Sequence, residues 1–232
     1  MKNILLIGGS YGIGLAIAKE LQYENKVFVA SRTNENIVDM HVTHIPFDAT
    51  TETLDTSLLP EVIDGLVYCP GSINLRPFKG LKPESFESDL QINFISLVKV
   101  IQSVLPNLVA SEQSSIVVFS SVAASMGMPF HTSVAAAKGA IEGFAKALAA
   151  EYTPKIRVNV IAPSLTDTPL ADKFLNNETK QEKSADRHPL KRFGKPEDCA
   201  NMASFLLSNK SSWITGQIFH VDGGMSTLLV NQ

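Results

Sequence analysis

A glycine-rich turn between two apolar segments near the N-terminus limits the fold of this chain more than any other feature. The run Asn3–Ile7 has the composition of a buried strand, and the sequence GGSYGIG at positions 8–14 follows it directly. An amphipathic helix is predicted after the turn, as far as about Leu21. A strand, a glycine turn and a helix in this order predict a nucleotide-binding α/β unit. A plain strand-to-helix connection is the alternative, because glycine turns occur there too.

The glycines of this turn have a physical role in binding phosphate. Glycine adopts backbone angles that other residues resist, and it lets a phosphate approach the main chain closely. The first turn of the helix presents free N–H groups and the positive end of its dipole to the same phosphate. We therefore predict a pyrophosphate site formed by Gly8, Ser10, Tyr11, Gly12, Ile13 and Gly14.

Short apolar runs alternate with helical segments along the rest of the chain. Strands are predicted at Asn3–Ile7, Lys26–Ala30, His44–Phe47, Ile63–Cys69, Ile116–Phe119, Val158–Ile161 and Gln217–Val221. Apolar residues at three- and four-residue steps predict helices over Leu90–Val104 and Val134–Leu148. The polar segment Ala171–Arg187 is predicted to be a mobile excursion over the site. The pattern predicts a single α/β domain over residues 1–232, with a doubly wound, mostly parallel seven-stranded sheet and helices on both faces.

Composition and charge exclude several classes of protein. Hydrophobic residues make up 44% and charged residues 19% of the chain, as in ordinary globular proteins. A net charge of −3 argues against a nucleic-acid partner. Cys69 and Cys199 lie far apart, and no Cys/His cluster indicates a metal site. The apolar start is too short for a signal peptide, and no run is expected to span a bilayer. We expect a cytoplasmic protein with no membrane partner.

The end of the second predicted strand indicates which dinucleotide is bound. Sites for NAD carry an acidic residue there for the ribose 2′-hydroxyl, whereas sites for NADP supply a cation. This chain has Ser31 and Arg32 at that position, and no carboxylate until Glu35. We predict NADP(H), with the Arg32 guanidinium at the 2′-phosphate. A solvated surface charge is the alternative for Arg32.

The spacing G-x-x-x-G-x-G, counted from Gly8, resembles that of the short-chain dehydrogenase/reductase family, and of 3-oxoacyl-carrier-protein-reductase-like members in particular. Further segments with this likeness are Cys69-Pro70-Gly71, Pro163–Thr168, Arg192–Glu197 and Thr215–Gly224. The resemblance implies that Asp48 contacts the adenine ring and that Thr168 holds the nicotinamide amide. The other cofactor contacts that it implies are Ala49, Cys69, Pro70, Gly71, Lys138 and Pro163.

The same resemblance implies hydride transfer between the nicotinamide and a small carbonyl or alcohol substrate. In that chemistry Ser121 orients the substrate oxygen, Lys138 binds the nicotinamide ribose, and Asn93 extends a proton relay through water. Each residue has a structural alternative. Ser121 could cap a helix, Lys138 could be a surface charge, and Asn93 could be a hydrogen-bonded buried amide.

The tyrosine that the resemblance places four residues before Lys138 is absent. Val134 stands there, and the chain has no tyrosine between Tyr68 and Tyr152. Valine cannot donate a proton, and loss of a general acid costs about 10²–10⁴ in rate. His131, close by, is the candidate replacement because an imidazole exchanges protons near neutral pH. A loop histidine facing solvent is the alternative.

The sequence therefore predicts an NADP(H)-dependent oxidoreductase with an altered proton donor. Two alternatives follow from Val134: an NADP-binding protein that is not a reductase, such as a sensor or an inactive subunit, and a dehydratase or isomerase that uses the same site. The resemblance implies a homo-oligomer, specifically a tetramer. The tail Met225–Val230, which contains the apolar Leu228, Leu229 and Val230, is predicted to pack at a symmetric interface.

Overall fold

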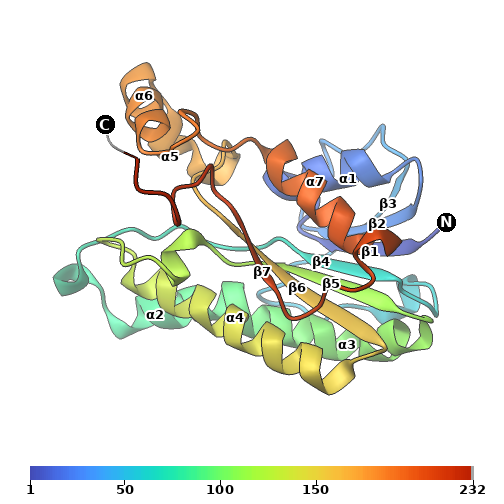
Figure 1. The fold of residues 1–232 in the computed structure, drawn as a ribbon. Coiled ribbons are helices and arrows are strands. Elements are labelled where there is room, and N and C mark those ends of the chain that lie inside the picture. Colours follow the sequence, from blue (N-terminus) through green and yellow to red (C-terminus); the bar gives the residue numbers. More distant parts are fainter. Residues whose placement is uncertain (231–232) are drawn as a thin grey trace.

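Seven parallel strands form one sheet in the computed structural model, which describes residues 1–230 (Figure 1). The strands are β1 Asn3–Ile7, β2 Lys26–Ser31, β3 Val42–Pro46, β4 Gly65–Tyr68, β5 Ser114–Phe119, β6 Ile156–Pro163 and β7 Ile218–Val221. Their order is β3-β2-β1-β4-β5-β6-β7. The chain winds outward from β1 in both directions, so the order reverses between β1 and β4, where open α/β sheets bind ligands. The predicted fold class is confirmed.

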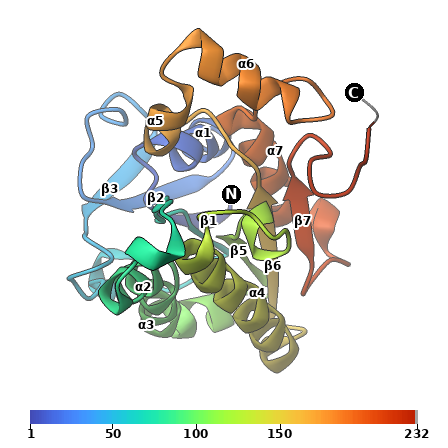
Figure 2. The ribbon, with the colours of Figure 1, turned by 90° about the vertical axis from the view of Figure 1, so that its left-hand side faces the viewer.

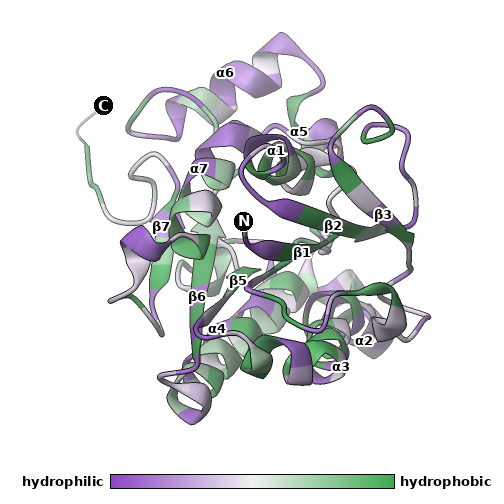
Figure 3. Cartoon of the chain, turned by 90° about the vertical axis from the view of Figure 1, so that its right-hand side faces the viewer, coloured by the Kyte–Doolittle hydropathy of each residue, from purple (hydrophilic) through white to green (hydrophobic). Residues whose placement is uncertain are grey.

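Helices cover both faces of the sheet (Figures 1 and 2). Helices α1 (Gly12–Leu21) and α7 (Pro196–Leu207) pack side by side on one face. The other face carries α2 (Pro83–Leu90), α3 (Ser96–Ala110) and α4 (Thr132–Tyr152). The sheet divides the apolar interior into two cores, one for each layer of helices. In Figure 3 the strands are mainly hydrophobic, whereas α6 (Glu178–Asp186) is mainly hydrophilic.

The polar segment after β6 contains more regular structure than the sequence predicted. It forms the short helix α5 (Asp172–Leu175) and then α6, which stand away from the body of the sheet (Figure 1). The side chain of Asn177 caps α6 by accepting a hydrogen bond from the Lys180 N–H at 2.9 Å. Local capping thus builds a helix where hydrophobic periodicity is missing. Helix α7 was also not predicted, although Pro196 at its first turn is a helix-start signal.

The helical stretch from Pro83 to Ala110 corrects one sequence expectation. Helix α2, a π-helical turn at Gln91–Ile95 and α3 follow one another without a break for 28 residues, long and apolar enough to cross a membrane by length and composition alone. Leu97, Ile101 and Val104 of this stretch are buried in the protein core. Its apolar face therefore already has a partner in the sheet, as in a core helix of any α/β domain.

Candidate active site

A cavity of about 240 Å³ opens at the carboxyl ends of β4, β5 and β6. Among its lining residues are Ser121, His131, Val134, Lys138 and Thr168. These residues come from three separate parts of the chain. In the sequence, only the family resemblance links them. The structure brings them to one cavity at the sheet edge where ligands of such folds bind.

Ser121 follows β5 and holds its hydroxyl at the cavity. Its Oγ accepts a hydrogen bond from the Ala123 N–H at 3.2 Å, so the residue does cap the short helical turn that follows. The cap uses only an oxygen lone pair. The hydroxyl proton is therefore free to be donated to a substrate oxygen, and the capping role and the proposed catalytic role are compatible.

Lys138 is a buried cation and not a surface charge. It lies in the second turn of α4, with 8% of its surface exposed, and its Nζ donates to the Phe119 carbonyl oxygen at 2.8 Å. Burial lowers the pKa of Lys138 to about 8, against the opposing influence of Cys69 and Asp89. An ammonium fixed in this way at the cavity can hold a ribose hydroxyl.

Asn93 lies in the π-helical turn, which departs from regular helix geometry at the site. Its Nδ2 donates to the Asp89 carbonyl oxygen at 2.8 Å and to the Ser72 Oγ at 2.9 Å. Its Oδ1 is buried and has no partner among the described residues. A methyl group built on Gly71 would lie 3.0 Å from this Oδ1 and 3.3 Å from the Lys138 Nζ. Two polar atoms thus flank one glycine, an arrangement suited to a water-mediated relay.

Val134 fills the position of the missing tyrosine with an apolar wall. Its side chain is 4% exposed and lines the cavity. His131 precedes α4, is partly buried and lines the same cavity, with part of its surface still open to solvent. The His131 Nδ1 lies 2.7 Å from the Pro129 carbonyl oxygen. Because a carbonyl only accepts, Nδ1 carries a proton and Nε2 is left to act on a ligand.

The glycine turn has the geometry that phosphate binding requires. Gly8 and Gly12 have φ angles of +77° and +52°, which side chains resist, and a Cβ on Gly14 would lie 2.3 Å from the Gly8 carbonyl oxygen. Tyr11 precedes α1 without a side-chain cap, and the first turn holds no acidic residue. The N–H groups of Ile13 and its neighbours are therefore available to an anion. Gly12 also lies against Thr168, so the predicted pyrophosphate and nicotinamide contacts are adjacent.

The predicted adenosine contacts meet beyond the ends of β2 and β3. Arg32 is exposed, and the ion pairs within residues 1–230 leave its guanidinium unpaired. The Asp48 carboxylate accepts from the Thr50 hydroxyl and N–H, which lowers the pKa of Asp48, with a smaller effect from Arg32. Ser31 Oγ donates to the Thr33 carbonyl. Glu35 lies close as well, since its carboxylate accepts from the Tyr11 hydroxyl at 3.4 Å.

Two predicted motifs border the cavity from other strands. Cys69 and Gly71 line it after β4, with Pro70 packed on Gly8, and Ala49 packs against the core beneath Asp48. Burial raises the pKa of the Cys69 thiol to about 12, so this cysteine is a neutral wall residue. Pro163 ends β6 and also lines the cavity.

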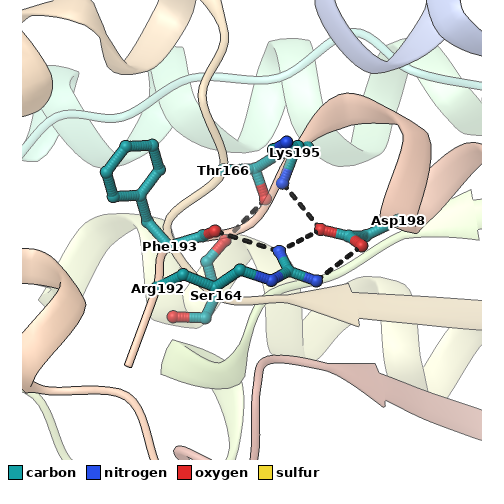
Figure 4. Close-up of polar contacts among 6 residues, drawn as sticks. All are labelled: Ser164, Thr166, Arg192, Phe193, Lys195 and Asp198. Atoms are coloured by element: carbon teal, nitrogen blue, oxygen red, sulfur yellow. Dashed lines mark hydrogen bonds and ion pairs between the residues drawn. The ribbon is translucent and has the colours of Figure 1, made fainter. Parts of the chain in front are cut away.

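An ion pair holds the segment after β6 in place. The Arg192 guanidinium donates to both Asp198 carboxylate oxygens, at 2.6 and 2.8 Å, and Asp198 also accepts from the Lys195 N–H (Figure 4). Thr166 pairs with Gly194 as a short parallel bridge, and its hydroxyl donates to the Ser164 carbonyl. The motif at 192–197 thus acts by positioning residues 163–168 and contributes no group to the cavity itself.

Sequence reasoning missed one polar pair in the cavity wall. Ser164 Oγ lies 2.6 Å from Nε2 of His188, a histidine with 3% of its surface exposed. The two residues are 24 positions apart, on either side of α5 and α6. No local pattern could have joined them. The only sequence signal was an isolated histidine in a polar segment.

Comparison with known proteins finds relatives that match almost the whole chain. The family model described as enoyl-(acyl carrier protein) reductase matches residues 8–226. The chain is 30% identical to a 3-oxoacyl-acyl-carrier-protein reductase of Buchnera aphidicola and 31% identical to that of Thermotoga maritima, covering 97% of this chain and of each relative.

Solved structures agree with these matches. An aldohexose dehydrogenase of Thermoplasma acidophilum superposes with a TM-score of 0.90 at 27% identity, covering 100% of this chain and 97% of the other. A short-chain type dehydrogenase/reductase of Mycobacterium ulcerans superposes with a TM-score of 0.87 at 27% identity, covering 97% and 90%. The chain belongs to the short-chain dehydrogenase/reductase family of oxidoreductases.

Proposed function

We propose that this protein is an NADP(H)-dependent oxidoreductase acting on a small carbonyl or alcohol substrate. The observation that carries the proposal is the convergence of Ser121 and Lys138 on one cavity, with Asn93 behind it and an uncapped helix N-terminus at its edge. A hydroxyl donor, a buried cation and a relay amide are what hydride transfer at a carbonyl requires from the protein.

The residues suited to hold the cofactor lie in the order that a dinucleotide needs. Arg32 would pair with the 2′-phosphate, the first N–H groups of α1 with the pyrophosphate, and Lys138 with the nicotinamide ribose. When bound, the reduced nicotinamide supplies a hydride to the carbonyl carbon. The exposed, unpaired guanidinium of Arg32 favours NADPH over NADH, although Glu35 lies near the same end of the site.

The protein's part in the reaction is to polarise the carbonyl and to return a proton. The Ser121 hydroxyl donates to the substrate oxygen, which stabilises the negative charge that develops there. Reduction also needs a proton on that oxygen, and Val134 cannot provide it. We assign this proton to the imidazolium form of His131: Nδ1 keeps its proton on the Pro129 carbonyl oxygen, and Nε2, which has no hydrogen bond within residues 1–230, gives the second proton to the substrate oxygen and leaves a neutral ring.

The test is stoichiometric oxidation of NADPH with a panel of aldehydes and ketones. We expect turnover in the wild type, its loss in Ser121→Ala, and unchanged NADPH affinity in that variant. Tight NADPH binding without turnover of any carbonyl would favour the non-reductase alternatives, which Val134 motivates. Turnover of an alcohol to an alkene without change in NADPH would favour a dehydratase.

A further inference from the structure

The pair Ser164–His188 is a second polar group in the wall of the same cavity. Ser164 follows β6 and His188 follows α6, and both line the cavity that holds Ser121 and Lys138. None of the roles assigned above uses either residue. Both ring nitrogens of His188 have hydrogen-bond partners, so burial of the imidazole is compensated, and the pair presents the Ser164 Oγ as a polar oxygen in the cavity wall.

The hydrogen-bond partners fix the polarity of the pair. The His188 Nδ1 lies 2.6 Å from the Ser184 carbonyl oxygen, which can only accept. Nδ1 therefore carries a proton, and Nε2 of the neutral ring is an acceptor. The Ser164 hydroxyl, at 2.6 Å, then donates to Nε2. Its Oγ also lies 3.1 Å from the Met225 Sδ, but one proton cannot serve both, and the imidazole is the stronger acceptor.

A donated proton leaves Ser164 Oγ with only lone pairs to offer a ligand. The same donation to an imidazole places extra negative charge on this oxygen, which makes it a better acceptor. Apolar residues dominate the nearby wall, among them Leu170, Phe174 and Met225. An oxygen restricted to accepting favours a ligand hydrogen-bond donor at this point of the wall, where Ser184 and Arg187 are further polar lining residues.

We infer that the Ser164–His188 pair binds a hydroxyl group of the substrate other than the oxygen that reacts at Ser121. The substrate class is accordingly a hydroxylated carbonyl compound or the corresponding polyol. This inference deepens the proposed function and rests on it for the reacting group, but the hydroxyl subsite itself can be tested without turnover.

Ser164→Ala removes one oxygen and leaves the cavity otherwise intact. Wild-type protein and the variant are compared on glyceraldehyde and erythrulose, and on propanal and butanone, which have the same carbon counts without hydroxyl groups. We expect kcat/KM for the hydroxylated probes to fall by about 10-fold or more, with little change for the other two. NADPH affinity should be unchanged.

Ser184→Ala is the matched control. Ser184 lines the same cavity, and the hydrogen bond that it accepts from His188 uses its main-chain carbonyl, which the substitution keeps. It should leave the preference for hydroxylated probes intact. The inference would be overturned if Ser164→Ala lowered kcat/KM equally for all four probes. It would also be overturned if Ser164→Ala and Ser184→Ala changed the preference for hydroxylated probes by the same factor.

Binding of erythrulose in the presence of NADP⁺, followed by saturation-transfer NMR, separates this inference from the proposed function. Loss of the signal in Ser164→Ala, in a protein that turns over no carbonyl, would support the hydroxyl subsite and refute the reductase. Carbonyl turnover that is the same in the wild type and in Ser164→Ala would support the reductase and refute the hydroxyl subsite. Absence of both binding and turnover in the wild type would overturn the subsite.

Discussion

Val134 and His131 face the same cavity with opposite chemical consequences. An apolar side chain at position 134 removes proton exchange from the place where the resemblance puts a tyrosine, and it leaves the imidazole of His131 as a nearby replacement. Lys138 stays buried at the cavity in spite of this change. The proposed role of Lys138 at the nicotinamide ribose does not need the tyrosine.

The proposed proton role of His131 predicts a clear effect of substitution. His131→Ala should lower kcat for carbonyl reduction by about 10²–10⁴ and leave NADPH affinity unchanged, because the ring acts on the substrate oxygen. Val134→Tyr, made in the His131→Ala background, should restore part of the lost rate. Steady-state kinetics with calorimetric NADPH titration measure both effects. Full turnover in His131→Ala would rule the histidine out.

The buried ammonium of Lys138 predicts how stability changes with pH. Its pKa is lowered from 10.5 to about 8 in the folded protein, so between these values the unfolded chain binds a proton that the folded protein has lost. Stability contributed by this group therefore rises with pH over that window and is level outside it. Relative to Lys138→Met, the wild-type free energy of unfolding should increase by on the order of 3 kcal/mol between pH 8 and 10.5.

Urea unfolding of the cofactor-free protein at several pH values measures that difference. If the difference in free energy of unfolding between the wild type and Lys138→Met stayed constant with pH, Lys138 would have its ordinary pKa. Lys138→Met should also weaken NADPH binding at pH 7, because the charged hydrogen bond to the ribose is lost.

The proposed preference for NADPH depends on the charge of Arg32. Arg32→Ala should weaken NADPH binding by about 1.5–3 kcal/mol, the typical contribution of a charged hydrogen bond, with little effect on NADH. Glu35→Gln is the companion variant, and it should improve NADPH binding if the carboxylate near Tyr11 repels the 2′-phosphate. Calorimetric titration of both cofactors measures these effects. Equal affinity of the wild type for NADPH and NADH would contradict the NADP assignment.

At the scale of elements, the start of α1 depends on close packing between the helix and the turn before it. Gly14 lies against the Gly8 carbonyl, at a distance that no Cβ can occupy. Gly14→Ala should push the helix away from the turn, destabilise the protein by about 1–3 kcal/mol, and abolish cofactor binding. Gly80→Ala is the control, because a Cβ there meets nothing within 4 Å.

Thermal unfolding and NADPH titration of the two glycine variants test this prediction. Gly80→Ala should change stability by no more than about 0.5 kcal/mol. If Gly14→Ala bound NADPH as the wild type does, the turn would not be the phosphate site.

At the scale of the whole molecule, exposed apolar residues indicate a surface that a single chain does not cover. The tail places Leu229 at 97% exposure, beside Leu228 and Val230. Such a run is unfavourable in water, so we predict a homo-oligomer, a tetramer, with the tail at a symmetric interface. Light scattering at micromolar concentration should give about four times the chain mass of 25.1 kDa. A particle of 25.1 kDa would exclude it.

Much of the fold can be predicted from local sequence patterns. Strand β1 matched its predicted bounds, because an unbroken apolar run followed by glycines leaves few alternatives. Strand β3 begins at Val42, two residues before the predicted start at His44, since a half-exposed edge strand has a weaker apolar signal. Helices α5 and α6 were not predicted, because α5 is only four residues long and α6 is a polar helix whose start depends on the Asn177 cap and not on hydrophobic periodicity.

The glycine turn, the Arg32 cation and the absence of a tyrosine before Lys138 were all determined by the sequence itself, since each depends on residue type and spacing along the chain. Only the tertiary structure decided that Lys138 is buried, that the Asn93 Oδ1 has no hydrogen-bond partner within residues 1–230, and that Ser164 meets His188. Contacts between distant residues depend on how helices and loops return to the carboxyl ends of the strands. Spacing along the chain does not show where these helices and loops return, because their packing against the sheet determines it.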